Sequence, residues 1–239
     1  MNKNLLSVAT ITLVRDDEEE QLLRESMLAL AAHDVPVYIT DGGSPAHFID
    51  FLRGFPNFIL SGTPAKGLLA QVANSLSAAY AAGADYILYS EPDKKHFFQE
   101  GLSPFLEQAS VNAQTGVLLA SRTAAGFASY PAFQRMTETT INNCCTEVTG
   151  HALDYTYGPF LMSCKLIPHL KFAQEDLAWG WRPYIFTIAH RLGLRLEEYQ
   201  GAFFCPPQQQ QDSAEERVYR MKQLEQNVRG VVLGAGVGL

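Results

Sequence analysis

The feature that most constrains this fold is a regular alternation of strand-like and helix-like segments in the first half of the chain. Short apolar runs rich in β-branched residues lie at 5–14, 35–44, 57–61 and 85–90. Segments with leucine at helical spacing lie at 18–33 and 66–83, and the first opens with a run of acids that suits a helix N-terminus. Strands that alternate with helices form βαβ units, and continuous apolar strands are covered on both faces. The sequence therefore predicts an α/β fold with a mostly parallel central sheet and helices on both faces.

The second half of the chain is less regular. It contains strand-like segments at 115–123 and 194–199, a short strand or bend within 157–167, and helical patterns at 133–148 and 173–193. Gly180 and Pro183 predict a kink in the last of these helices, because proline removes a helical hydrogen bond. We expect a single domain over 1–239, composed of a first half at 1–123, a second half at 124–212 and a C-terminal helix and tail at 213–239.

The C-terminal segment is predicted to form an amphipathic helix. Ser213 and Glu216 form an S-x-x-E capping box that opens it, and Gly230 marks its approximate end. One face carries apolar side chains, at Val218, Met221, Leu224 and Val228. This face is expected to pack on the chain's own core, and packing on a partner, as in a homo-oligomer, is the alternative. The segment 205–213, CPPQQQQDS, is predicted to be a loop.

The composition argues against several classes of function. The formal net charge of -7 and the pI near 5.4 do not suit binding driven by phosphate backbones, so no nucleic acid is expected as a partner. No apolar stretch approaches the roughly 20 residues of a membrane helix, and no signal peptide is recognisable. The 4 cysteines form no CxxC pair, which argues against a zinc site or a disulfide framework. Reduced thiols and a cytoplasmic location are expected.

Polar and acidic residues collect where the predicted strands of the first half end. The four ends read VRDDEEE, TDGGS, GTPAKG and SEPDKK. In open parallel sheets, ligands bind outside the carboxyl ends of the strands. Each of these motifs is weak alone, but their occurrence in order along the chain predicts a ligand site at this edge of the sheet.

Glu91 and Asp93 are candidate metal ligands. One residue separates them in an extended segment, so both side chains can point towards the same face. Paired carboxylates suit Mg²⁺ or Mn²⁺, which accept phosphate oxygens as further ligands. The local sequence alone favours the alternative, in which Pro92, Asp93 and Lys94 form a turn and the acids are solvated.

Other strand ends offer candidate contacts to a ligand. Asp41 precedes two glycines, so its carboxylate could accept hydrogen bonds from a nucleobase or a ribose, or could cap its own turn. Lys66 and Gly67 stand at a predicted helix start, where a cation and backbone N–H groups suit a diphosphate; a solvated lysine is the alternative. Asp17 could reach the same base, although an acid in a first helical turn is also explained by the helix dipole.

Glu175 and Asp176 open a predicted helix that also carries two tryptophans. A carboxylate here could take a proton from an acceptor hydroxyl, and a tryptophan could stack on a sugar. The alternatives are a helix N-terminus stabilised by acids and tryptophans that fill the core. The sequence contains no P-loop motif, no dinucleotide fingerprint and no G-x-S-x-G nucleophile.

Taken in order, these segments resemble the GT-A family of nucleotide-sugar glycosyltransferases, particularly its family-2-like members. The resemblance rests on VRDDEE, TDGGS, AKG and EPD, then on LLASR and QEDLAWGWR, and extends from Ser7 to Tyr199. Its most specific part is the stretch from AKG to EPD, which is a predicted helix followed by the fourth strand. It implies a Rossmann-like GT-A fold, with a nucleotide-sugar-binding half at 1–123 and an acceptor-binding, catalytic half at 124–212.

The resemblance also implies that these residues share one ligand. Glu91 and Asp93 would hold Mg²⁺ or Mn²⁺, with Asp93 the more direct ligand, whereas Asp176 or Glu175 would be the base of an inverting enzyme. The donor would be a nucleotide-diphosphate sugar, and its implied contacts are Arg15, Asp17, Asp41, Lys66, Gly67 and Arg122. The acceptor would be a small molecule, a lipid or a glycan with a free hydroxyl.

One departure from the family's pattern keeps other functions open. Glu91 stands where the family usually has Asp, which lengthens one arm of the metal motif. A catalytically silent protein that binds nucleotide-sugars, or a partner subunit, is therefore an alternative. A sugar nucleotidyltransferase is another, but that class normally has a glycine-rich loop after its first strand, and TLVRDDEEE contains no glycine.

Overall fold

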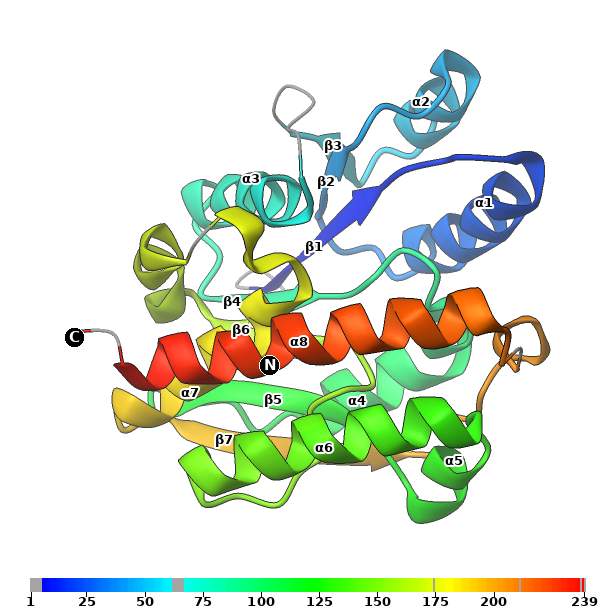
Figure 1. Cartoon of the computed structure of the whole chain (residues 1–239). Helices are drawn as coiled ribbons and strands as arrows, with labels where there is room; N and C mark the ends of the chain where they lie inside the picture. Colours follow the sequence, from blue (N-terminus) through cyan, green and yellow to red (C-terminus); the bar gives the residue numbers. More distant parts are fainter. Residues whose placement is uncertain (1–5, 62–66, 174, 211, 237, 239) are drawn as a thin grey trace. The chain divides into compact units, whose positions relative to one another are not determined.

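The computed structural model describes residues 6–61, 67–173, 175–210, 212–236 and 238, with the backbone alone at 172, 175 and 208 (Figure 1). The chain divides into two compact units. The first comprises Met1–Val111 and Pro159–Ile167, and the second comprises Asn112–Gly158 and Pro168–Leu239. The expected mixed α/β class is confirmed, since strands and helices alternate along the described residues. None of the helices in this part of the chain is both long enough and apolar enough to cross a membrane.

The first unit contains a sheet with the strand order β3-β2-β1-β4-β6. Its strands are β1 (Leu6–Thr12), β2 (Val37–Asp41), β3 (Phe58–Leu60), β4 (Tyr86–Tyr89) and β6 (Phe160–Ser163). β1 pairs in parallel with both β2 and β4, so that Val8 lies opposite Val37 on one side and Leu88 on the other. β6 is antiparallel to β4, and it shows that the segment expected to be a strand or a bend is a strand.

Helices cover both faces of this sheet, as predicted. Figure 1 shows α1 (Asp17–Ala31) and α2 (Ala46–Arg53) on one side of β1, β2 and β3, and α3 (Leu68–Ala81) on the other. α1 begins after Asp16, whose carboxylate caps the helix by accepting from the Glu19 N–H at 2.8 Å. The sequence patterns do not predict α2, the π-helix η2 (Phe97–Gly101) or α4 (Leu102–Gln108), because these segments are too short for a clear helical period.

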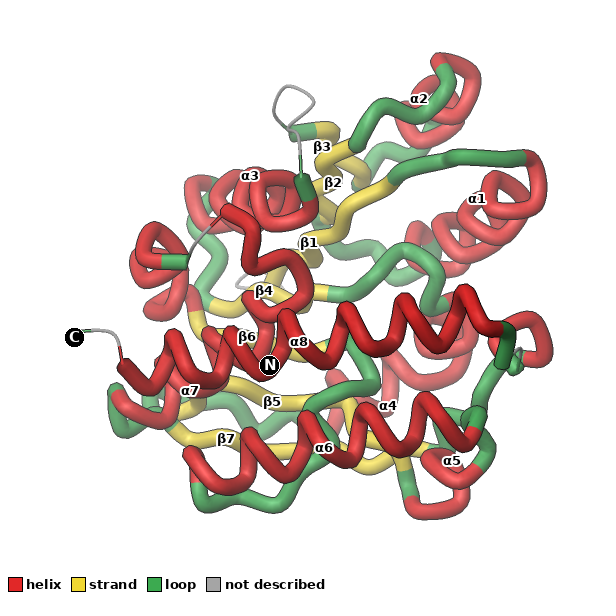
Figure 2. Tube along the Cα trace, viewed as in Figure 1, coloured by secondary structure: helices red, strands yellow, loops and turns green. Residues whose placement is uncertain are grey.

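The second unit is built around β5 (Thr115–Arg122), which pairs in parallel with β7 (Arg195–Gly201). The helices of this unit are α5 (Ala124–Ala128), α6 (Ala132–Thr149), α7 (Trp181–Arg191) and α8 (Ala214–Gly236). Short 3₁₀ segments in or next to it are η3 (Cys164–Phe172), η4 (Glu175–Gly180) and η5 (Pro207–Gln209). α6 and α8 run side by side (Figure 2), and α8 also packs against α7 and η4.

The segment predicted to be one kinked helix at 173–193 contains two helices, η4 and α7. The break lies at Ala178, whose φ of 46° and ψ of -123° are not helical. Pro183 lies in the first turn of α7, where its missing N–H breaks no helical hydrogen bond. The predicted kink is therefore present, but it begins at Ala178, two residues before the expected stretch from Gly180 to Pro183, and Pro183 does not cause it.

The predicted end of the C-terminal helix is wrong, and its predicted apolar face is only partly covered. Its start is as expected, with the Ser213 hydroxyl accepting from the Glu216 N–H at 3.2 Å, but α8 continues to Gly236. Val218 and Met221 are 47% and 49% exposed. The residues that α8 buries are Asn227, Gly230, Val231 and Gly234. Leu224 and Val228 of the predicted stripe are half-buried, and the fully buried residues lie in the glycine-rich second half of the helix.

Gly230 is needed for close packing and not for ending the helix. A Cβ atom at Gly230 would lie 1.9 Å from the carbonyl oxygen of Gly180, and a Cβ atom at Gly180 would lie 2.0 Å from the carbonyl oxygen of Gln226. Further along, the Arg191 guanidinium donates to the carbonyl oxygen of Gly234 at 2.7 Å. The backbone of α8 thus lies directly on η4 and α7, at a distance that only glycine permits.

Candidate functional site

Three neighbouring strands of the first unit bring the predicted donor-binding residues to one edge of the sheet. β2, β1 and β4 are adjacent and parallel, so their carboxyl ends lie on the same side. Asp41 is the last residue of β2, and Glu91 follows β4 by two residues. This edge is where ligands bind in open parallel sheets.

Asp41 organises the turn that follows β2. Its carboxylate accepts from the backbone N–H groups of Gly43 and Ser44, at 2.8 and 2.7 Å, and from the Thr12 and Ser44 hydroxyls, at 2.8 and 2.6 Å. The Ser44 hydroxyl also accepts from the Val14 N–H at 2.9 Å, which ties the end of β1 to the same turn. These contacts support the reading of Asp41 as a turn cap, and a contact to a nucleotide stays a prediction. Ser44 was missed by sequence reasoning, although the TDGGS motif contains it.

The residues expected to assist Asp41 lie at the start of α1. The Arg15 guanidinium and the Arg15 backbone N–H both donate to the Glu19 carboxylate in the first turn of α1. Asp17 is exposed in the first turn, where an acid also stabilises the helix dipole. Both side chains are on the surface of the first unit.

Glu91 and Asp93 lie in a turn that β1 holds in place. The Thr10 hydroxyl donates to the carbonyl oxygen of Ser90 at 2.8 Å, and the Ser90 N–H donates to Ala9. Glu91 is only 8% exposed and Asp93 is half-buried. Buried carboxylates in proteins are paired with donors or with metal ions, since an isolated buried charge is costly.

The chemistry of this pair fits a divalent metal that is bound together with a nucleotide. No group of three or more His, Cys, Asp or Glu side chains among the described residues could enclose a metal. Mg²⁺ is usually held by one or two carboxylates together with substrate phosphates and water, rather than by an all-protein cage. Two carboxylates separated by one residue can supply this kind of donor set.

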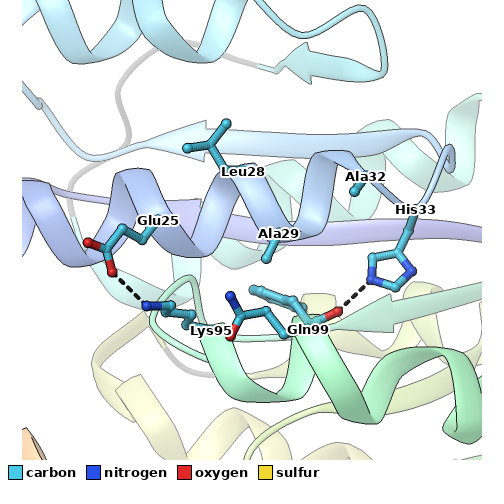
Figure 3. Close-up of a pocket in the computed structure, with 8 residues that line it drawn as sticks. Glu25, Leu28, Ala29, Ala32, His33, Lys95 and Gln99 are labelled. Carbon is cyan, nitrogen blue, oxygen red and sulfur yellow. Dashed lines mark hydrogen bonds and ion pairs between the residues drawn. The ribbon is translucent and has the colours of Figure 1, made fainter.

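The segment that follows Asp93 is held by contacts with α1 and with His33, just after this helix. The Lys95 ammonium forms an ion pair with Glu25 at 2.7 Å, and its hydrogen bond lowers the pKa of Glu25 below the ordinary value, assisted by Gln21. His33 donates to the carbonyl oxygen of Phe98 in η2 at 2.5 Å. Figure 3 shows both contacts bordering a shallow pocket of about 590 Å³ between α1 and η2. Lys95 therefore points into this pocket and anchors the turn that carries Asp93.

The predicted diphosphate contact falls partly outside the described residues, because Lys66 belongs to the undescribed range 62–66. Gly67 is described and precedes α3, where its carbonyl oxygen accepts from the Gln71 N–H at 3.2 Å. Its φ of +92° is a conformation that favours glycine, and no atom of the described residues would lie within 4 Å of an added Cβ.

Arg122 is buried in the second unit, where its guanidinium is surrounded by acids and aromatic rings. Its side chain is 1% exposed and donates two hydrogen bonds to the Asp154 carboxylate, at 2.7 and 2.9 Å. It also forms an ion pair with Glu138 at 2.8 Å. The rings of Phe127 and Tyr130 lie 4.7 and 4.6 Å from it. The geometry therefore favours a structural role for Arg122 over the donor contact that the resemblance implied.

The charges of this cluster stabilise one another. Burial alone would lower the pKa of Arg122, but Glu138 and Asp154 raise it above its ordinary value. Burial alone would raise the pKa of Asp154, but the Arg122 guanidinium lowers it below 3.8. Sequence reasoning missed Asp154 and Glu138, because nothing in their spacing from Arg122 indicates that they meet.

The predicted catalytic segment is η4, in the second unit. The side chain of Glu175 is not described, whereas the Asp176 carboxylate is 71% exposed and pairs with Arg229 of α8 at 2.9 Å. The Trp179 indole N–H donates to the Tyr219 hydroxyl of the same helix at 3.1 Å. The two tryptophans differ, since Trp181 is wholly buried and only Trp179 is near the surface.

Comparisons with known proteins identify the fold. No family model and no curated protein matches the sequence. Solved structures match over 98% of the chain, among them glucosyl-3-phosphoglycerate synthase from Mycobacterium tuberculosis with uridine diphosphate, at a TM-score of 0.65, 13% identity and 81% of that chain. The same enzyme with Mn²⁺, UDP-glucose and phosphoglyceric acid matches at a TM-score of 0.66, 13% identity and 80% of that chain. A structure described as a mycobacterial protein matches at a TM-score of 0.65 and 13% identity, over 76% of that chain.

These matches confirm the predicted GT-A-like α/β fold for this chain. At 13% identity, they support the fold and leave the chemistry to the residues of the site.

Proposed function

We propose that this protein is a glycosyltransferase that moves a sugar from a nucleotide-diphosphate sugar to an acceptor hydroxyl with the help of a divalent metal ion. One observation carries the proposal. The parallel strands β2, β1 and β4 bring Asp41 and the Glu91–Asp93 turn to a single sheet edge, in a fold shared with an enzyme solved with UDP-glucose and Mn²⁺.

In this proposal, the first unit binds the donor. Glu91 and Asp93 hold Mg²⁺ or Mn²⁺ against the diphosphate, and Asp93 is the more direct ligand because its arm is shorter and more exposed. The metal, when bound, supplies positive charge that stabilises the departing diphosphate. The start of α3 offers the Gly67 backbone to the same phosphates, together with Lys66.

The nucleoside end of the donor is assigned to the turn after β2 and the start of α1. Asp41 presents this turn to the base or the ribose, and Arg15 and Asp17 border it. Because Asp41 already receives hydrogen bonds from its own turn, its main effect is to fix the shape of that turn. UDP is the first donor nucleotide to test, since the neighbouring enzyme is solved with it.

The second unit supplies the base. The Asp176 carboxylate accepts the proton of the acceptor hydroxyl, whose oxygen forms a bond to the anomeric carbon. The bond between that carbon and the diphosphate oxygen breaks, and the nucleoside diphosphate leaves with the electron pair. Glu175 is the second candidate for this role. An acceptor that carries phosphate and carboxylate is the first to test, because the neighbouring structure holds phosphoglyceric acid.

The proposal places the enzyme in the cytoplasm. Burial raises the pKa of the Cys145 and Cys164 thiols to about 12, as expected of structural cysteines that stay reduced.

The proposal is tested with a panel of UDP, GDP, CDP and ADP and their sugars, each with and without Mn²⁺ or Mg²⁺. A ligand at 100 times its Kd stabilises the native state by about 2.7 kcal/mol, so one nucleotide is expected to raise the melting temperature only with metal. The nucleotide-sugar that binds is then assayed for release of its nucleoside diphosphate with and without phosphoglycerate. Metal-dependent binding without release under any condition favours the silent nucleotide-sugar-binding alternative, and no binding at all contradicts the proposal.

A further inference from the structure

The segment that carries Asp176 is held by the C-terminal helix at three points. The Arg229 guanidinium donates to the Asp176 carboxylate at 2.9 Å. Three residues further along η4, the Trp179 indole N–H donates to the Tyr219 hydroxyl at 3.1 Å. At the end of η4, Gly180 lies against α8 so closely that a Cβ atom would come within 2.0 Å of the Gln226 carbonyl oxygen. A charge, a hydrogen bond and a backbone contact thus connect η4 to α8 within the second unit.

The backbone of η4 needs this support. Ala178 has a φ of 46° and a ψ of -123°, a combination that residues other than glycine rarely adopt. Strained conformations of this kind persist only where the surroundings hold them, and they concentrate at functional sites. Trp179 and Gly180 follow Ala178 directly, and both contact α8. These contacts hold the backbone of η4 in place immediately after Ala178.

In the described contacts, the charged partner of the Asp176 carboxylate comes from α8. Arg229 is 38% exposed, and its hydrogen bond with Asp176 raises the pKa of the guanidinium above its ordinary value, with Glu225 adding to the effect. Glu225, on the preceding turn of α8, lies 3.6 Å from Arg229. From α7, Arg182 stacks over the Trp179 ring at 5.8 Å. Among the described side chains, Arg229 is therefore the cation that contacts the Asp176 carboxylate directly.

We propose that Arg229 is a positioning residue, which orients the Asp176 carboxylate for proton abstraction from the acceptor. This inference rests on the proposed function, in which Asp176 is the base. A general base must be within hydrogen-bond reach of the proton that it accepts, and its orientation is then part of the rate. On an exposed carboxylate, a guanidinium that donates to one oxygen leaves the other oxygen directed and available.

The test compares Arg229→Met with Arg217→Met on the same helix. Arg217 is also a partly exposed arginine with one close carboxylate partner, since it pairs with Asp212 at 2.9 Å and lies over the Phe133 ring at 5.8 Å, and none of its described contacts is with η4. Arg229→Met is expected to lower kcat by about 10- to 100-fold, with the KM for the donor and the melting temperature close to those of the unmutated enzyme. Arg217→Met is expected to keep kcat. Arg229→Lys retains the cation but loses the fork, and it is expected to recover part of the loss.

A double variant shows whether Arg229 acts through Asp176. In an Asp176→Asn background the base is already gone, so adding Arg229→Met is expected to change kcat by less than about twofold. Full additivity of the two effects, or an unchanged kcat in Arg229→Met, would overturn the inference while leaving the proposed function intact. Absence of transfer by the unmutated enzyme, with every donor and acceptor tried, would overturn both. A fall in melting temperature equal in Arg229→Met and Arg229→Lys, without the recovery of kcat, would assign Arg229 a purely structural role.

Discussion

Asp41 and Asp93 stand at the same sheet edge, but their carboxylates have different surroundings. Asp41 receives four hydrogen bonds from Thr12, Gly43 and Ser44, so replacing it would disturb the turn as well as any ligand contact. Asp93 is half-buried at the tip of a turn that is fixed separately, by Thr10 on one side and by Lys95 on the other. Because its turn has these separate anchors, Asp93 is the residue chosen to test the metal site.

Asp93→Ala is expected to abolish metal-dependent binding of the nucleotide and to leave the melting temperature of the free protein nearly unchanged. Loss of a carboxylate ligand removes the charge that holds the metal against the diphosphate. Titration calorimetry with UDP and Mn²⁺ measures the effect, with Asp50→Ala on α2 as the control, since Asp50 is exposed and pairs only with Arg53 in the described contacts. Binding that is unchanged in Asp93→Ala would remove the metal assignment.

The ion cluster around Arg122 predicts a stability that depends on pH. Asp154 has a lower pKa when folded than the 3.8 of an ordinary Asp, because Arg122 stabilises its charged form. Its contribution to stability is therefore complete above 3.8 and is lost as the pH falls through the folded pKa. Asp154→Asn is expected to cost about 3 kcal/mol at pH 7, since it leaves a buried guanidinium short of one partner.

Urea unfolding at several pH values measures this contribution. The difference in free energy of unfolding between the unmutated protein and Asp154→Asn should shrink below about pH 4, as Asp154 becomes protonated. Asp50→Asn breaks an exposed ion pair and should cost less than about 1 kcal/mol at any pH. A difference that stays constant from pH 7 to pH 2 would contradict the role given to the Asp154 charge.

α8 has two halves that pack in different ways. Its first half shows apolar side chains to solvent, with Val218 and Met221 about half exposed. Its second half has little side-chain bulk and approaches η4 and α7 through Gly230 and Gly234. Helices that pack through glycine gain many backbone contacts, and an added methyl group has no room to relax.

Gly230→Ala is expected to lower the free energy of unfolding by about 1–3 kcal/mol, because its Cβ would overlap the Gly180 carbonyl and force the helices apart. Gly236 offers a control on the same helix, since no atom of the described residues lies within 4 Å of a Cβ added there. Gly236→Ala should be neutral or should stabilise by up to about 1 kcal/mol through its helix propensity. Chemical denaturation measures both variants, and equal effects would contradict the close packing of α8.

Much of the architecture follows from the sequence because the strongest signals are local. β1, β2 and β4 are continuous apolar runs, and α1 and α3 are long enough to show a helical period. The elements that the sequence does not reveal are short, such as α2 and η2, or depend on distant contacts. The length of α8 is an example, since Gly230 reads as a helix end until its contact with Gly180 is known.

The candidate site was predictable to a different degree in each unit. Strand ends bring Asp41, Glu91 and Asp93 to one edge by topology alone, so motif order was sufficient to find them. In the second unit, Arg122 meets Asp154, and Asp176 meets Arg229, across long stretches of sequence. No local pattern encodes such pairs. The prediction therefore named Arg122 and Asp176 without finding the partners that define their environment.

The strand β6 has a consequence for how the chain is synthesised. It completes the sheet of the first unit by pairing Leu161 with Leu88 of β4, yet it follows α6 in the sequence. A nascent chain that has reached Val111 contains β1 to β4, while the outer edge of β4 still lacks its neighbour. Open strand edges invite pairing with other chains, and long-range pairing is slow. Until residues 160–163 leave the ribosome, the edge of β4 in the unit that is proposed to bind the nucleotide therefore stays open to pairing with other chains.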